Sequence, residues 1–190
     1  LKRLRMFVLR SDAKLHDAST ELARFAISGD CAAELLPFAP GDDKACLTRE
    51  QTTIIRLPGD RPRFELIGPP EILAQTWRRL LDTAEQTGPD FWSLMDIRAG
   101  MPTVFEDTLE AFVPQMVNLQ LIDGVSFSKG CYTGQEVVAR MQYLGKLKRR
   151  MYRARINTSE RPAPGSEVFA ASGDADAAVG RLVDDARYPD

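Results

Sequence analysis

The segment from residue 52 to residue 83 constrains the fold of this chain more than any other. Thr52–Leu57 and Arg63–Ile67 are rich in β-branched and aromatic residues, and the Pro58-Gly59-Asp60 turn signal separates them, which predicts a β-hairpin. Apolar residues then recur at helical spacing over Glu71–Thr83, directly after two prolines. Two strands, a turn and an amphipathic helix in this order indicate an α+β unit over about residues 1–85.

Weaker patterns precede this hairpin. Asp17–Glu21 carries a helix-capping pattern, and Leu22, Phe25 and Ala26 recur at helical spacing, so we expect a helix over Glu21–Ser28 that ends at Gly29. A second, short helix is expected over Cys31–Leu36, and Cys46 has the surroundings of a loop residue.

The second half of the chain changes character along its length. Helices are predicted over Phe91–Ala99 and Glu136–Gln142, each followed by a glycine, with an irregular stretch between them. Alternation of polar and apolar residues in Met151–Ile156 predicts a strand, and short runs at Glu167–Ala170 and Ala178–Val183 predict two more. We therefore expect a small β-domain to open at about residue 147.

Composition narrows the class of protein. The 190 residues are 44% hydrophobic and carry a formal net charge of −2, so nothing in the global charge favours nucleic acid as a partner. Three cysteines without a CxxC pair and a single histidine favour neither a disulfide framework nor a metal site, and they fit a reducing, cytoplasmic compartment. No apolar run approaches the roughly 18 residues that span a bilayer. The chain begins at Leu1 rather than at a methionine, and Val183–Asp190 has no recognisable terminating element, so we expect it to be truncated at both ends.

The most informative chemistry lies in Lys129–Glu136, where Gly130 and Gly134 flank a Cys-Tyr-Thr core ahead of a predicted helix. A thiol before a helix N-terminus faces the positive end of the helix dipole, and Lys129 adds a second positive charge, so Cys131 is a candidate nucleophile, redox centre or transient ligand for a soft metal. The alternative is a small buried thiol, packed where the two glycines let backbones approach. No general base is identifiable nearby.

Two further charge patterns each have a structural and a functional interpretation. Glu136 and Arg140 stand four residues apart on one helical face. They could form a solvated ion pair, or they could contact a pterin or a glutamate tail. A basic run close to Tyr143 and Tyr152 fits either an RNA phosphate stripe or, as we favour here, a solvated strand face plus a linker. The run consists of Lys146, Lys148, Arg149, Arg150, Arg153 and Arg155.

Lys129–Glu136, continued by Val137–Arg140, resembles the hallmark of the YgfZ family, which are folate-binding proteins related to the aminomethyltransferase (T-protein) of glycine cleavage. The resemblance is close over about residues 91–150, and the flanking sequence matches only in the order of its elements. The supporting segments are Ile97–Pro102, Val113–Gln115, Asn118-Leu119 and Gly124–Phe127.

This resemblance implies a fold and a division of the chain. It implies an α+β, GcvT/YgfZ-like folate-binding fold with the start of a C-terminal small β-barrel. The expected domains are 1–87, an α+β domain; 88–146, the remainder of the folate-binding domain with the motif; and 147–190, the start of the barrel. Part of the family's folate site would lie N-terminal to this chain.

The resemblance also implies a function. We expect a tetrahydrofolate-binding accessory protein in the assembly or repair of iron–sulfur clusters, which supports tRNA modification indirectly. Its partners would be folate and iron–sulfur proteins or cluster assembly factors, without direct binding to nucleic acid or membrane. Cys131 would be the functional thiol, with Lys129 beside it, and Gly130 and Gly134 would shape the motif backbone. The expected folate contacts are Arg98, Glu110, Tyr132, Gln135, Glu136 and Arg140.

Two other functions remain open. A folate-dependent aminomethyltransferase or demethylase is the first alternative, although the motif cysteine argues against a classical aminomethyltransferase, which typically lacks it. An RNA-binding module built on the basic run is the second.

Overall fold

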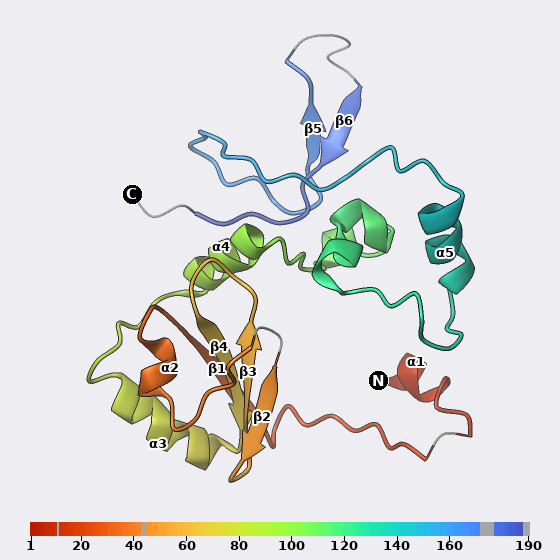
Figure 1. The fold of residues 1–190 in the computed structure, drawn as a ribbon. Helices are drawn as coiled ribbons and strands as arrows, with labels where there is room; N and C mark the ends of the chain where they lie inside the picture. The colour runs from red at the N-terminus through yellow and green to blue at the C-terminus, as the bar shows by residue number, and fades with distance from the viewer. Residues whose placement is uncertain (11, 43–44, 172–176, 188–190) are drawn as a thin grey trace. The chain divides into compact units, whose positions relative to one another are not determined.

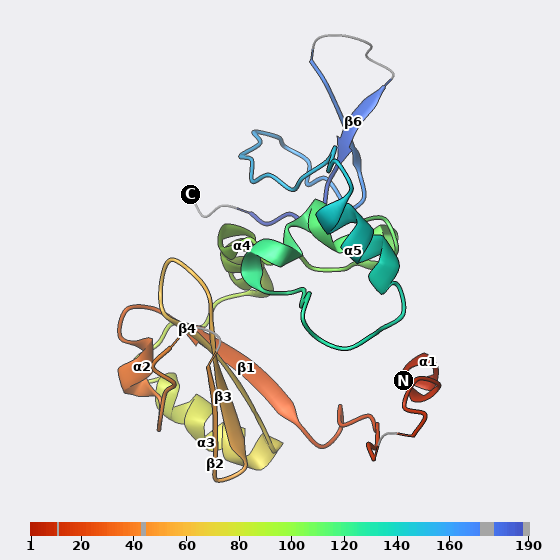
Figure 2. The same ribbon diagram turned by 45° about the vertical axis from the view of Figure 1, so that its right-hand side comes forward.

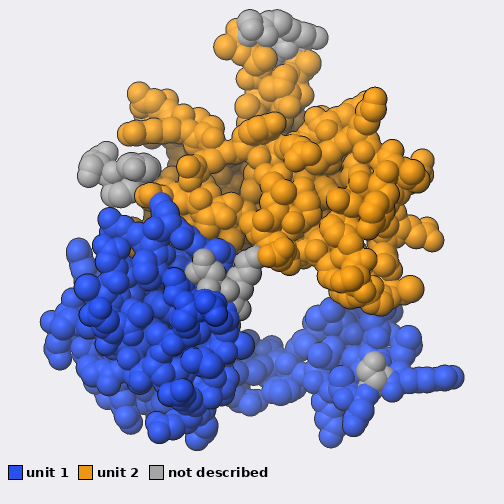
Figure 3. Space-filling view, viewed as in Figure 1, with its two compact units in different colours: residues 1–86 blue, residues 87–190 orange. Residues whose placement is uncertain are grey.

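The computed structural model describes residues 1–10, 12–42, 45–171 and 177–187 (Figure 1). The chain divides into two compact units, Leu1–Gln86 and Thr87–Asp190, which Figure 3 shows in different colours. Each unit has its own secondary structure and its own set of buried residues, and each is described separately.

The first unit is built around a four-stranded antiparallel sheet (Figures 1 and 2). Along the chain it contains α1 (Lys2–Arg5), β1 (Ala23–Ser28), α2 (Ala32–Leu35), β2 (Cys46–Arg49), β3 (Thr52–Leu57), β4 (Arg63–Gly68) and α3 (Pro70–Leu80). The strands lie in the order β1-β4-β3-β2, so the β3–β4 hairpin forms the centre of the sheet.

One face of this sheet carries the core. Side chains alternate between the two faces of a strand, and the register places Ile27 of β1 opposite Phe64, and Ile54 of β3 opposite Leu66. Ile54, Phe64 and Leu66 are fully buried and form one cluster with Leu73 and Leu80 of α3 and Ala32 of α2. Both views show α2 and α3 along the same side of the sheet (Figures 1 and 2). The predicted hairpin and the helix that covers it are confirmed.

The helix expected over Glu21–Ser28 is wrong, because Ala23–Ser28 forms strand β1. Its apolar residues satisfy helical spacing and also period-two alternation, and pairing with β4 decides between them. The residues of the expected cap form a local turn instead, in which the Asp17 carboxylate accepts hydrogen bonds from the backbone N–H and the hydroxyl of Ser19.

Strand β2 was not predicted from the sequence. It is an exposed edge strand, and Glu50 and Gln51, both with positive φ, connect it to β3 in a tight two-residue turn. Such turns normally contain Asn-Gly or Asp-Gly, so Glu-Gln gave no recognisable turn signal.

The second unit combines short helices with a small two-stranded antiparallel sheet. It contains α4 (Pro89–Ala99), the 3₁₀ helices η1 (Glu106–Thr108), η2 (Pro114–Val117) and η3 (Leu119–Ile122), helix α5 (Gln135–Tyr143), β5 (Glu167–Phe169) and β6 (Ala178–Arg181). The helices predicted over Phe91–Ala99 and Glu136–Gln142 are confirmed, and Gly100 ends α4 in the left-handed conformation that glycine adopts readily.

The strand predicted at Met151–Ile156 is wrong, because these residues form no regular structure. Two side-chain hydrogen bonds hold this segment to other parts of the second unit. The Met151 carbonyl accepts a hydrogen bond from the Asn118 side chain at 2.9 Å, and Arg153 donates to the Arg98 carbonyl at 3.1 Å.

The α+β class with antiparallel sheets is confirmed, whereas the GcvT/YgfZ-like fold, the barrel start and the three-domain division stay predictions. Among the described residues, no helix has the length and apolar character needed to cross a membrane.

Candidate functional site at residues 129–140

The turn before α5 is closed by the motif's own residues. Gly134 precedes the helix with φ of +89°, a left-handed conformation that costs other residues free energy. The Gln135 backbone N–H donates to the Tyr132 carbonyl at 3.2 Å, and the Gln135 side-chain oxygen accepts from the Tyr132 N–H at 3.3 Å. Gln135 therefore holds Tyr132 in place from both directions.

Lys129 and Tyr132 form a second contact inside the motif. The Lys129 ammonium lies 4.6 Å from the centre of the Tyr132 ring, within the range of a cation–π interaction. The Lys129 backbone N–H also donates to the Ser126 hydroxyl at 3.2 Å. This pair places a positive charge and an aromatic face within three residues of one another.

Cys131 lies between these two residues as an exposed free thiol. The alternative in which it is a small buried thiol is therefore wrong. A Cβ added at Gly130 or at Gly134 would meet no atom within 4 Å, so neither glycine is needed for a close backbone approach. The motif presents its sulfur to the surface four residues before the first residue of α5.

Glu136 and Arg140 are both exposed on α5. Within the described part of the chain no ion pair links them, so the interpretation as a solvated ion pair finds no support in this geometry. A carboxylate and a guanidinium four residues apart on α5 are therefore both exposed to solvent.

Arg98 and Glu110 come from other elements of the same unit. Arg98 is exposed near the end of α4, and its carbonyl contacts Arg153 beyond the motif. Glu110 is exposed after η1, with φ of +58°. The structure thus gathers the motif residues in one turn and the start of one helix, while Arg98 and Glu110 lie on separate segments.

A buried amide supports the motif helix from behind, and sequence reasoning had assigned it no role. Gln115 of η2 is only 2% exposed and donates to the Val138 carbonyl of α5 at 2.6 Å. Its own side-chain oxygen, like those of Asn118 and Gln120, is buried without a partner among the described residues. The sequence signal that could have indicated this role is the position of Gln115, a polar residue between Pro114 and the apolar pair Met116-Val117.

Alignments to known proteins cover most of this chain. No protein-family model matches the chain. It is 38% identical over 157 residues to the tRNA-modifying protein YgfZ of Colwellia psychrerythraea, an alignment that covers 80% of this chain and 47% of the relative. It is 35% identical over 136 residues to the protein of the same name from Yersinia enterocolitica, which covers 72% of this chain and 41% of the relative. The chain belongs to the YgfZ family. It spans less than half the length of these curated relatives.

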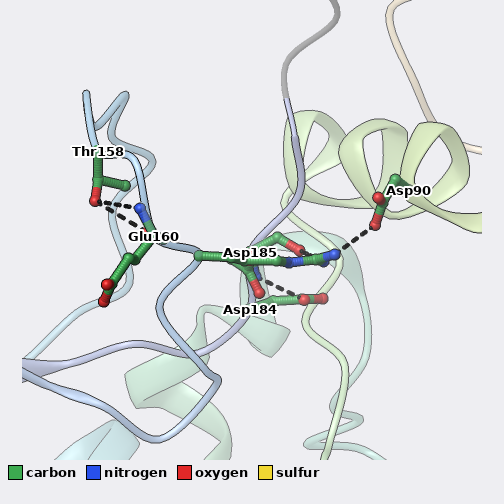
Figure 4. A network of polar contacts seen from close by, with 6 residues as sticks. Asp90, Thr158, Glu160, Asp184 and Asp185 are labelled. Atoms are coloured by element: carbon green, nitrogen blue, oxygen red, sulfur yellow. Dashed lines mark hydrogen bonds and ion pairs between the residues drawn. The ribbon is translucent and has the colours of Figure 1, made fainter.

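A second polar centre of this YgfZ-family chain joins Arg161 to Asp90 and Asp185, and Figure 4 labels both aspartates. The Arg161 guanidinium donates to Asp90 at 2.8 Å, to the Asp185 carboxylate at 2.5 Å and to the Asp185 carbonyl at 3.1 Å. Hydrogen bonds to Asp185 and then to Asp90 raise the pKa of Arg161. Burial raises the pKa of the neighbouring Asp184, against the hydrogen bonds that it accepts from the Asp185 N–H and from Thr103.

Two of the hollows in the described residues are lined by residues outside the YgfZ motif. One of about 350 Å³ is bordered by Phe105, by Arg161–Pro164 and by Asp184-Asp185, and the other, of about 310 Å³, lies between Glu34–Leu36 and the end of α3. The motif is a surface feature and is not enclosed by either hollow. No group of three or more His, Cys, Asp or Glu side chains gathers within the described ranges in a way that would hold a metal ion.

Proposed function

We propose that this chain binds tetrahydrofolate and acts as an accessory protein in the assembly or repair of iron–sulfur clusters, through which it supports tRNA modification. The observation that carries the proposal is the likeness to proteins named tRNA-modifying protein YgfZ over 80% of the chain, together with the exposed Lys129–Glu136 motif. Because the chain spans less than half of these relatives, the activity of the whole protein is part of the proposal.

The chemistry of the motif side chains fits a folate. A folate carries a flat pterin ring with hydrogen-bond donors and acceptors, and a glutamate tail with carboxylates. Arg140 offers a guanidinium that binds a carboxylate bidentately, Glu136 accepts from ring N–H groups, and Tyr132 offers an aromatic face. Gln135 contributes indirectly, because its side-chain oxygen is engaged with the Tyr132 backbone.

Cys131 has a different role in this proposal. Its thiol is exposed, so a client protein has access to it, and in the sequence it stands between Lys129 and Tyr132, whose ammonium and ring are in contact. We assign Cys131 to the contact with the iron–sulfur client rather than to folate. The cluster is then the cargo of the protein, since one motif cysteine does not supply the four ligands that clusters usually take.

Calorimetric titration with tetrahydrofolate tests the folate half of the proposal. We expect the intact protein to bind and the Arg140→Ala variant to bind about tenfold or more weakly, because a charge-assisted bond to the tail is lost. Arg78→Ala, which removes an exposed arginine from α3, is the matched control and leaves the affinity unchanged. Absence of binding by the intact protein contradicts the proposal.

A second assay separates the thiol from the folate site. Cys131→Ala is expected to keep its affinity for tetrahydrofolate and to lose the ability to restore activity to an iron–sulfur tRNA-modifying enzyme in cells that lack the protein. Formation of methylenetetrahydrofolate from an aminomethyl donor would instead favour the aminomethyltransferase alternative.

A further inference from the structure

The segment after α5 concentrates positive charge. We define the basic segment as residues 146–155. Residues 137–159 contain no Asp or Glu, although the whole chain has a formal net charge of −2. Residues 137–159 contain seven positively charged residues, which are Arg140, Lys146, Lys148, Arg149, Arg150, Arg153 and Arg155. This local excess of positive charge creates a positive surface potential, although the net charge of the whole chain is negative.

The structure changes half of the interpretation of this segment. A solvated strand face would direct alternate residues inward, but residues 146–155 form no strand. Figure 1 shows an irregular path between α5 and β5, which agrees with the expected linker. Lys146, Lys148, Arg149 and Arg150 are all exposed. None of these four forms an ion pair with a residue that the structure describes. Their charges are therefore available to an external anion.

The basic segment is also anchored at its C-terminal half. The hydrogen bonds from Asn118 to the Met151 carbonyl and from Arg153 to the Arg98 carbonyl tie it to two other elements of the second unit. Anchoring lowers the conformational entropy that is lost when a ligand binds. The segment is thus partly ordered before it meets a partner.

Two exposed tyrosines flank the cations. Tyr152 is 83% exposed and Tyr143 is 70% exposed, so both present ring surface to solvent. Cations that contact phosphates, combined with aromatic rings that stack on unpaired bases, are the usual elements of a single-stranded nucleic-acid site. A membrane-binding segment would instead present a continuous apolar helix face, and this segment contains no helix.

We propose that the basic segment, together with Tyr143 and Tyr152, is a binding site for single-stranded RNA. Lys146, Lys148, Arg149 and Arg150 contact the phosphates, and the tyrosines stack on unpaired bases. This goes beyond the folate function, and it is the opposite of the expectation that the chain does not bind nucleic acid directly; the experiment below decides between them.

Fluorescence anisotropy with a labelled single-stranded RNA of about 12 nucleotides tests the site, measured between about 50 and 200 mM salt. We expect the R149Q/R150Q variant to bind more weakly, with a salt dependence of log K that is shallower by about 1.4, because two phosphate contacts are lost. R78Q/R79Q neutralises another exposed arginine pair, on α3, and serves as the matched control with unchanged binding.

The stacking role has its own pair of variants. Tyr152→Ala is expected to weaken RNA binding about tenfold, whereas Tyr152→Phe keeps the ring and the affinity.

The proposal is overturned if R149Q/R150Q binds like the unaltered chain, or if an RNA duplex of equal length binds as tightly and Tyr152→Ala has no effect. Tighter binding to phosphatidylserine vesicles than to RNA overturns it in favour of a membrane surface. Tetrahydrofolate calorimetry on the same variants reports on the folate proposal separately, because none of these residues belongs to the motif.

Discussion

Single buried side chains connect the motif to the rest of its unit. Gln115 reaches from η2 to the Val138 carbonyl of α5, and Asn118, two residues before Gln120, reaches to Met151. Buried amides of this kind stabilise a fold only while their donors and acceptors are matched, and here three oxygens remain without a described partner. The position of the motif helix therefore depends on the Gln115 hydrogen bond together with the packing of the buried Val138.

Replacing Gln115 by glutamate tests this dependence with almost no change in size. Gln115→Glu removes the donor to Val138 and puts a carboxylate in a buried position, so we expect the free energy of unfolding to fall by at least about 2 kcal/mol at neutral pH. Gln142→Glu, on the exposed side of α5, is the matched control and stays within about 0.5 kcal/mol. Equal urea midpoints for the two variants would show that the Gln115 hydrogen bond is unimportant.

Asp184 predicts a pH effect. Burial raises the pKa of Asp184 above the ordinary value of 3.8. Between these two pKa values the folded chain binds more protons than the unfolded chain. The free energy of unfolding therefore decreases as the pH rises through this range. Asp184→Asn keeps an acceptor for the Asp185 N–H without the charge. We expect the variant to melt at a higher temperature than the unaltered chain at pH 7 and at the same temperature below about pH 3.8. A lower melting temperature at pH 7 would contradict the desolvation argument.

At the scale of elements, tight turns decide where helices and strands begin. Gly134 sets the start of α5 from a left-handed conformation, and Glu50-Gln51 turn β2 into β3 with two positive φ angles. The glycine is a visible signal in the sequence, whereas Glu-Gln is not. This difference explains why α5 was predicted and β2 was missed.

The two motif glycines give a matched pair of variants. Gly134→Ala places a Cβ in the left-handed region and is expected to cost about 1–2 kcal/mol, although no neighbouring atom obstructs the methyl group. Gly130→Ala also meets no neighbour, its φ is not in that region, and it should be tolerated. Hydrogen exchange of the α5 amides measures the effect, with about 5- to 30-fold faster exchange expected for Gly134→Ala alone. If both variants exchange at the same rate, the conformation of Gly134 does not control the helix.

At the scale of the whole molecule, the two units have cores of different size. Residues of β1, α2, β3, β4 and α3 form one continuous apolar cluster within the first unit. In the described part of the second unit the buried apolar residues are few and come from α4, η2 and α5; they are Leu94, Met95, Val117 and Val138. A self-contained core is the physical condition for independent folding.

A fragment that ends at Gln86 tests this condition. We expect it to unfold cooperatively and to keep a near-ultraviolet circular dichroism signal from Trp77, which packs edge-on against Phe25 with ring centres 5.2 Å apart. Phe64→Ala in the same fragment removes a fully buried ring at a cost of about 3–5 kcal/mol and should abolish the signal. A fragment without cooperative unfolding would show that the first unit depends on the rest of the chain.

The sequence by itself determined the elements whose signals are local. The β3–β4 hairpin, helix α3, the two helices of the second unit and the family were all readable, because turn residues, helical periodicity and an eight-residue motif do not depend on distant contacts. Tertiary structure alone decided the rest. Ala23–Ser28 forms a strand because β4 pairs with it, whereas Met151–Ile156 pairs with no strand among the described residues. The same distinction holds for the site. Cys131 is visible in the sequence, but only the structure shows that it is exposed. Only the structure also shows that Gln115 supports α5, because this hydrogen bond joins residues far apart in the chain.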